Sequence, residues 1–576
     1  MRKVTGLALS FGVVVSAVLL AQTADKPPAE KPPQGQIGGL RFRDVAEVTV
    51  VNVDVSVSDR KGPIRGLQPS DFEVYQDGRL QDISNFAFYQ REGPAEAPAV
   101  PPTAVPTAAP SPTPAAEPAA PRREPRFMAL YVDNQNLAPF DRNRVVNKVS
   151  EWIRNNLAAP DQAMVVSYQR SLKIMQPFTS DPEDIADALR TTKTYTGGRT
   201  EVNSSRRDIE NAINQSGNQG SDPNRSDSAL GRVRAFAREQ RNDLMFTIRA
   251  LQDLVTMMSG LPGKKSVIYV SDGLPMTPGL ELFYEIQDKL QDTSAVSQSH
   301  DFEASSLYRG LVTSAAAAGV TFYTIDARGL ESELGNEAEN QQARSTLAAS
   351  IGRTNYQDSL VYIAEQTGGL AIVNTNDVMP GLNRIADDLE TYYSLGYRLV
   401  PSGQDRIHRI EVKIKGHPEY RLNYRHTFIE KSLPTRIADR VMTGLAFDLS
   451  DNPMGITLSA GDPTPASSGR WALPVEIKVP IAKIALVPDG DELTGYVMAY
   501  YAARDDEGKQ SDLQNVEHVV RVPKADYEKA KHEEFTFTAS LLLEPGRYRI
   551  SVGVRDELTN QAGYAGLRKL VHPGQT

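Results

Sequence analysis

Short, unbroken apolar runs alternate with helical patterns over the middle of this chain, and that alternation restricts the fold most strongly. Residues 127–132 and 266–270 are continuous apolar runs of strand length, as expected for strands that are buried on both faces. Between them, Val145, Val149 and Trp152 recur at helical spacing. Strands that alternate with helices predict a parallel sheet with helices on both faces. We therefore expect an open, doubly wound (Rossmann-like) α/β domain over residues 125–398.

All-β segments flank this predicted domain. Residues 41–92 begin with Val alternating with Asn, Asp and Ser, the period of a half-buried strand. Residues 399–429 return to that period, and we expect a β-hairpin with its turn at Gly416. Each segment is small for an independent core, so we expect residues 41–92 to pair with 400–428 around an inserted α/β domain.

The last part of the chain, residues 430–576, contains further strand patterns punctuated by Pro and Gly, with little helical signal. This pattern is typical of a second, immunoglobulin-like β-sandwich. The overall prediction is a multidomain protein, α/β plus all-β, with the α/β sheet flanked by β-sandwich domains.

The first 24 residues are similar to an export signal. Arg2 and Lys3 precede an apolar run from Leu7 to Leu20, and small residues follow it. The alternative is a membrane anchor, but the run is shorter than the roughly twenty residues of a spanning helix. We expect cleavage at residues 21–25 and a secreted or periplasmic protein without a stable membrane anchor after signal cleavage.

Two segments have compositions that cannot bury a core. Residues 25–40 are rich in Pro and Gly, and residues 93–124 are dominated by Pro and Ala. Such segments do not offset their own ordering entropy, so we predict a flexible segment and an extended linker.

Composition excludes several classes of site. The 576 residues include no Cys, which excludes disulfides, thiolate zinc sites and cysteine nucleophiles. The 63 Lys and Arg against 72 Asp and Glu leave a net charge of −9, so we expect no nucleic-acid partner, because such a partner needs a basic face.

Polar residues follow the buried runs at the places where an α/β sheet binds ligands. Asp133 follows the first run, Asp272 follows the second, and Thr200 lies on a Gly-Gly turn between them. Ligands of open α/β sheets bind outside the carboxyl ends of the strands, and an oxygen-only set suits a hard cation such as Mg²⁺. Each Asp taken alone is better explained as a helix cap or turn residue, but three such residues together at matching strand ends weaken that explanation.

The order of Asp133, Thr200 and Asp272-Gly273 resembles that of a von Willebrand factor A (VWFA) domain. That family carries a metal-ion-dependent adhesion site built from D-x-S-x-S, a distant Thr and a distant Asp. Further segments over residues 41–428 are similar to the VWFA-related proteins found in acidobacteria: Gly66-Leu67, Asp71-Phe72-Glu73-Val74, Asp77-Gly78, Ala364-Glu365-Gln366-Thr367-Gly368-Gly369 and Tyr393-Ser394-Leu395-Gly396-Tyr397.

The resemblance implies Asp133, Gln135, Thr200 and Asp272 as ligands of Mg²⁺ or Mn²⁺. Gln135 replaces the first serine of the motif and has a carbonyl oxygen to offer, directly or through water, whereas Leu137 replaces the second and cannot coordinate. Two interpretations stay open: a weakened cation site that accepts a partner's carboxylate, or a scaffold that has lost its metal and binds through its loops.

Three classes of function follow from these patterns. The first is an exported adhesion module that engages a protein or cell-surface ligand. The second is a metal-free structural component of a cell-envelope assembly. The third, a metal-assisted hydrolase using Asp133 and Asp272, lacks a recognisable general base, so we expect no enzyme. The stretch Gly260–Ser266 contains two Gly and two Lys, but it precedes a strand where a phosphate-binding loop would follow one, so we interpret it as a turn.

Overall fold

The structure is a computed structural model. It describes residues 49–60, 62–90, 125–217, 223–330, 345–447 and 451–572. The predicted signal peptide, the segment 25–40 and the linker 93–124 lie outside the described residues.

A six-stranded mixed sheet forms the centre of the α/β domain, with the order β10-β9-β8-β5-β6-β7. Its strands pair in parallel except for β7, which runs antiparallel to β6 at the edge. Every residue of the central strand β5 is buried, which explains its continuous apolar sequence. The strands are β5 Phe127–Asp133, β6 Gln162–Gln169, β7 Ser171–Thr179, β8 Lys265–Ser271, β9 Val320–Asp326 and β10 Ala371–Ile372.

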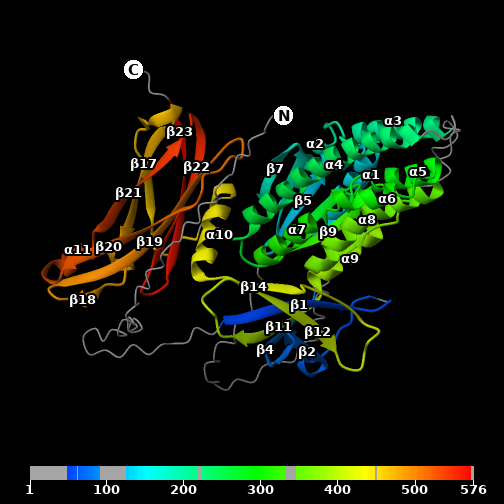
Figure 1. Ribbon diagram of the computed structural model, residues 1–576. Helices are drawn as coiled ribbons and strands as arrows, with labels where there is room; N and C mark the ends of the chain where they lie inside the picture. The colour runs from blue at the N-terminus through cyan, green and yellow to red at the C-terminus, as the bar shows by residue number, and fades with distance from the viewer. Residues whose placement is uncertain are drawn as a thin grey trace, which may run out of the picture. The chain divides into compact units, whose positions relative to one another are not determined.

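Helices cover both faces of this sheet (Figure 1). Side chains of β5 alternate between two cores: Tyr131 faces the helices α4, α7 and α8, whereas Leu130 and Val132 face α1, α2 and α9. None of the helices in the described ranges is long and apolar enough to cross a bilayer. The helices are α1 Pro139–Asn156, α2 Pro182–Thr192, α3 Arg199–Gly217, α4 Pro223–Met258, α5 Leu280–Leu290, α6 Ala295–Gln298, α7 Ser305–Ala318, α8 Thr346–Thr367 and α9 Met379–Glu390.

Strands from both sides of the α/β domain pair with one another. One sheet has the order β13-β1-β11-β4 and another β14-β12-β2-β3, and the two share one core. In the first, Val51 lies opposite Tyr397. The strands are β1 Thr49–Ser58, β2 Phe72–Gln76, β3 Arg79–Gln81, β4 Ile83–Tyr89, β11 Tyr392–Leu399, β12 Arg406–Ile414, β13 Arg421–Tyr424 and β14 Thr427–Glu430.

The β segments differ from expectation in two places. The strands β12 and β13, expected to form a hairpin, lie in different sheets: β12 pairs with β2 and β14, and β13 pairs with β1. Both strands turn apolar side chains toward the same core, so the chain crosses from one sheet to the other between them. The α/β domain also ends earlier than residue 398, because α9 stops at Glu390 and β11 joins β1.

The C-terminal region packs two further sheets around one core. A helix that the sequence analysis did not anticipate, α10, precedes them and buries Ile437, Val441 and Leu445 against β19. The predicted combination of an α/β domain with all-β regions is confirmed. The elements are α10 Leu433–Ala446, β15 Thr457–Ala460, β16 Thr464–Pro465, β17 Trp471–Pro480, β18 Val487–Asp489, β19 Glu492–Asp505, β20 Gln514–Pro523, α11 Tyr527–Ala530, β21 Glu534–Leu543, β22 Gly546–Asp556 and β23 Ala562–Val571.

Candidate binding site at the carboxyl edge of the sheet

Asp133 is the last residue of β5 and its carboxylate is completely buried, at 0% exposure. It caps a 3-10 turn at Asn134–Asn136, and its oxygens accept hydrogen bonds from the backbone and side-chain amides of Asn136 at 3.0–3.3 Å. Tyr269 Oη donates at 2.5 Å and Ser271 Oγ at 3.3 Å. Burial raises the pKa of Asp133 to about 6, and the hydrogen bonds from Tyr269 and Asn136 oppose that rise.

Asp272 directly follows β8 and is 1% exposed. Its Oδ2 accepts a hydrogen bond from the Ala138 amide at 2.8 Å, whereas its buried Oδ1 has no partner within the described residues. Burial raises the pKa of Asp272 to about 7, and the positive charge of Arg199 is the largest influence in the other direction. Arg199 is itself buried, with its guanidinium carbon 4.0 Å from the centre of the Tyr356 ring.

Asn136 joins the carboxylate of Asp133 to the backbone of Asp272. Its side chain binds Asp133, and its carbonyl oxygen accepts the Asp272 amide at 3.1 Å. The structure therefore brings Asp133 and Asp272 to one edge of the sheet, on the two sides of a single residue. Ser271, Tyr269 and Asn136 were not singled out from the sequence, because nothing in their spacing marks them as partners of Asp133.

The Gly-Gly turn packs its backbone directly on the loop that follows β5. The Gly198 amide donates to Asn134 O at 3.0 Å. A Cβ atom at Gly197 would lie 2.3 Å from Leu137 O, and one at Gly198 would lie 2.5 Å from Gln135 O. Only glycine permits this approach, so the turn holds the start of α3 against the edge of the sheet.

The other two predicted ligands lie apart from the buried pair. Thr200 is exposed on the first turn of α3, and no hydrogen bond links it to Asp133 or Asp272 in the part of the chain that the structure describes. The preceding residue, Arg199, takes the buried position instead. Gln135 is half-buried and lines a neighbouring cavity.

The donor set does not fit the octahedral oxygen shell of Mg²⁺. Hydrogen-bond donors already occupy both oxygens of Asp133, Thr200 is exposed, and the Leu137 side chain is apolar and buried. The described residues contain no cluster of three or more His, Asp and Glu side chains placed to hold a metal. Arg199 instead supplies a positive charge beside Asp272.

An acidic cavity of about 360 Å³ lies beside the loop that follows β5 and the Gly-Gly turn. Gln135 and Gly198 line the cavity, so the loop that follows Asp133 and the Gly-Gly turn form part of its wall. Burial, and then the nearby Glu239, raise the pKa of Asp243 in its wall. The sequence did not identify the residues of α4 as part of a cavity wall, because their charge-rich pattern is also typical of a solvated helix face. The remaining lining residues are Tyr168, Arg170, Glu201, Val202, Ser205, Phe236, Gln240 and Phe246.

No family model matches the chain, and no curated protein matches it. Solved structures similar to it include an aerotolerance-related membrane protein from Bacteroides fragilis, with 13% identity, 46% of this chain and 98% of that chain covered, and a TM-score of 0.22. The conserved hypothetical protein BatB from Bacteroides thetaiotaomicron has 12% identity, coverage of 46% and 96%, and a TM-score of 0.22.

A third similar structure is proximal thread matrix protein 1 from the mussel byssus with a zinc-occupied MIDAS motif. It has 13% identity, covers 48% of each chain and has a TM-score of 0.23. These identities and TM-scores are too low to assign the chain to a family, so the VWFA resemblance stays a prediction from the sequence.

Proposed function

We propose that this protein is an exported binding module that engages a basic segment of a protein or surface ligand at the carboxyl edge of its α/β sheet. The observation that carries the proposal is the acidic cavity lined by Gln135 of the loop that follows β5 and Gly198 of the Gly-Gly turn. It lies where open α/β sheets place their ligands. Binding there is reversible and needs no metal, in keeping with the adhesion function that the sequence predicts.

The chemistry of the cavity favours a cationic group. Three carboxylates, Glu201, Glu239 and Asp243, line it against one cation, Arg170. Because the pKa of Asp243 is raised by burial and by its acidic neighbours, a bound ammonium or guanidinium would relieve repulsion within the wall.

Aromatic side chains in the same wall support this choice of ligand. Phe246 is 61% exposed beside the carboxylates, and Phe236 and Tyr168 also line the cavity. An aromatic face attracts Lys and Arg side chains by a cation–π interaction of about 0.5–2 kcal/mol. A lysine or arginine side chain of a partner would therefore contact both carboxylates and aromatic rings in this wall.

The test is fluorescence anisotropy with defined peptides. The full chain is titrated into peptides that carry a central Lys or Arg, and into matched peptides with Gln at that position. We expect the basic peptides alone to bind, and the variant Glu239→Gln/Asp243→Asn to weaken binding by about tenfold or more, since two charge-assisted contacts are lost. EDTA should leave the affinity unchanged.

The matched control is Asp506→Asn/Glu507→Gln, which neutralises two exposed carboxylates in the turn after β19. It should bind like the unmodified chain. The proposal fails if no basic peptide binds, or if both double variants bind equally well. Binding that EDTA abolishes would restore the metal-dependent interpretation of Asp133, Thr200 and Asp272.

A further inference from the structure

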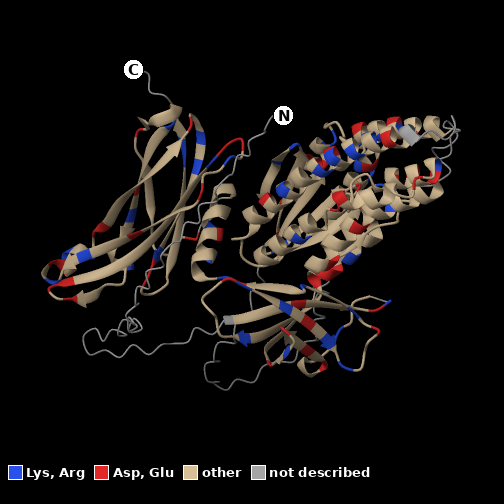
Figure 2. Cartoon of the chain, in the orientation of Figure 1, with Lys and Arg blue, Asp and Glu red and all other residues tan. Residues whose placement is uncertain are grey.

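A second cavity, of about 400 Å³, lies where β8 begins, at the opposite end of that strand from Asp272. The turn before β8, the end of α7, the segment between β13 and β14, and α10 form its walls. Acidic and basic residues are interspersed over most of the chain (Figure 2), but this cavity gathers one sign of charge. Its charged lining residues are Lys265, Arg425, Lys431, Arg436 and Arg440, with Asp439 as the one carboxylate among them.

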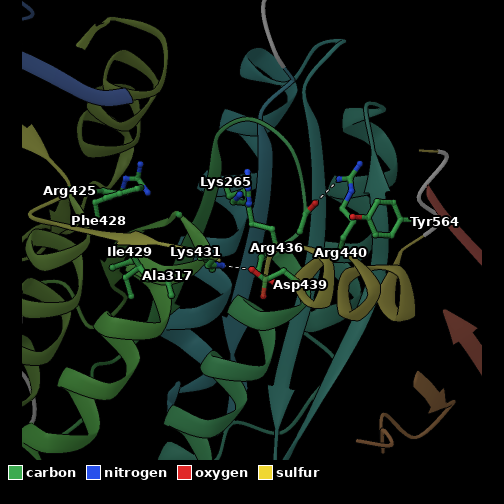
Figure 3. A pocket seen from close by; sticks show the side chains of 15 residues that line it. Lys265, Ala317, Arg425, Phe428, Ile429, Lys431, Arg436, Asp439, Arg440 and Tyr564 are labelled. Carbon is green, nitrogen blue, oxygen red and sulfur yellow. Dashed lines mark hydrogen bonds and ion pairs between the residues drawn. The ribbon is translucent and has the colours of Figure 1, made fainter. Parts of the chain in front are cut away.

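Two of these cations converge at a glycine. Gly319 follows the last residue of α7 with a left-handed φ of 67°, a conformation that favours glycine. Because glycine has no side chain, this position of the cavity wall is left open. A Cβ atom there would lie 3.2 Å from a guanidinium nitrogen of Arg425 and 3.8 Å from Lys265 Nζ. Figure 3 shows Lys265 between Arg425 at one end and Arg440 with Tyr564 at the other. The glycine leaves open the space that these cations face.

The charges of the cavity are only partly compensated. Lys431 forms an ion pair with Asp439, and Arg440 pairs with Asp451 at 2.6 Å and donates to Gly260 O at 2.6 Å. Lys265 Nζ donates only to the Leu261 carbonyl, at 2.9 Å. In the described ranges Arg425 has neither a hydrogen bond nor an ion pair, and the charge of Asp54, which is paired with Lys264 at 3.5 Å, opposes the lowering of the Arg425 pKa by burial. The carboxyl end of α7 adds roughly half a negative charge, less than the two positive charges of Lys265 and Arg425.

This arrangement costs the protein free energy in the absence of a ligand. Burial, and then the neighbouring charges of Arg425 and Lys431, lower the pKa of Lys265 to about 8. Like charges held close together in a partly desolvated space repel one another. An anion between them attracts each cation and so offsets that repulsion.

We propose that this cavity binds a phosphate group, held between Lys265 and Arg425 with Arg440 at its edge. The cations come from three separate elements, β8, the segment between β13 and β14, and α10. A tetrahedral phosphate accepts from donors on several sides, whereas a flat carboxylate is the partner of a single Arg fork. The turn at residues 260–264 precedes β8, so side-chain cations, not a ring of backbone amides, hold the anion. Inorganic phosphate, a phosphate ester and a lipid headgroup share this chemistry.

Calorimetric titration of the full chain at constant ionic strength tests the proposal. Inorganic phosphate, glycerol phosphate and vesicles containing phosphatidic acid are titrated separately, with chloride as the reference anion. We expect saturable binding of at least one phosphate-bearing probe, and the three arms distinguish the sources. Arg425→Gln should weaken it by about tenfold or more, because a charge-assisted contact is lost.

Lys265→Gln provides a second, independent variant. Both variants remove repulsion, so we expect each to unfold at a higher temperature than the unmodified chain without phosphate while losing the stabilisation that phosphate confers. Arg470→Gln and Lys529→Gln, which change exposed residues elsewhere, should retain full affinity. The absence of saturable binding to all three probes overturns the proposal. So does binding that neither Arg425→Gln nor Lys265→Gln weakens.

Discussion

Burial controls the protonation of Asp133 and Asp272, because the exposed fractions of these residues are only 0% and 1%. Four donors from Asn136, Tyr269 and Ser271 partly repay the desolvation of Asp133. Asp272 receives one backbone hydrogen bond and the field of Arg199. The less compensated of the two carboxylates therefore has the higher pKa, about 7 against about 6.

This difference predicts how stability depends on pH. The pKa of Asp272 rises from 3.8 in the unfolded chain to about 7 in the folded one, so the folded state binds the extra proton between those values. Stability then falls as the pH rises from 4.5 to 7.5, by about 3 kcal/mol. Asp272→Asn should remove most of that fall, as measured by urea unfolding at both pH values. Parallel pH profiles for the variant and the unmodified chain would contradict this assignment.

Tyr269→Phe separates the hydrogen bond to Asp133 from the packing of the ring. At pH 7.5 the carboxylate is ionised, and losing a charge-assisted bond should cost about 1.5–3 kcal/mol of unfolding free energy. At pH 5 the carboxyl is neutral, and the cost should fall to about 0.5–1.5 kcal/mol. Tyr323→Phe offers a comparison, since its hydroxyl bonds Asp388, whose carboxylate is not part of this site. Equal costs at both pH values for Tyr269→Phe would contradict the prediction.

At the scale of elements, the approach of the Gly-Gly turn to the loop after β5 shapes the site. Gly198→Ala would place a methyl group 2.5 Å from Gln135 O, so one loop must move. We expect a loss of about 1–3 kcal/mol of stability, typical of overpacking, together with weaker peptide binding. Chemical unfolding and anisotropy measure the two effects.

Gly231→Ala is the matched control for that change. Gly231 lies within α4, and a Cβ atom there would meet nothing within 4 Å. The control should be more stable than the unmodified chain by about 0.5–1 kcal/mol, because alanine restricts the unfolded helix segment. A Gly198→Ala variant that behaves like this control would show that the two loops are free to separate.

The sequence allowed the strong elements to be predicted for clear physical reasons. A strand buried on both faces has to be apolar throughout, and β5 and β8 are. In contrast, α10 was missed although Ser432 caps it and Ile437, Val441 and Leu445 recur at helical spacing. Strand patterns surround it, and one amphipathic helix among them is a weak local signal.

The candidate site was only partly predictable. Parallel strands end at one edge of a sheet, so Asp133 and Asp272 could be placed together from their positions alone. The inward orientation of Arg199, with Thr200 exposed, depends on where α3 begins and on contact with the Tyr356 ring. No pattern in the local sequence contains that information, because the ring comes from α8, far along the chain.

At the scale of the whole molecule, strand pairing around the α/β domain predicts a strong effect of truncation. A chain that starts at residue 125 lacks β1 to β4, and the core residues Tyr393 and Leu395 would lose their covering strands. We expect this chain to aggregate and to bind the dye ANS, whereas a chain of residues 46–576 stays monomeric. Light scattering and dye fluorescence measure the difference. Monomeric behaviour of both chains would show that β11 to β14 fold without β1.

The hydroxyl of Tyr393 accepts a hydrogen bond from the Leu67 amide, a residue 326 positions earlier, and donates to Ile64 O. During synthesis the early strands emerge long before the residues that complete their sheet. Their pairing strand β11 follows the α/β domain in the sequence, so the early strands lack this partner until that domain has been synthesised. The strands β1, β2 and β4 would therefore stay without their later partners until residues beyond 390 have been made.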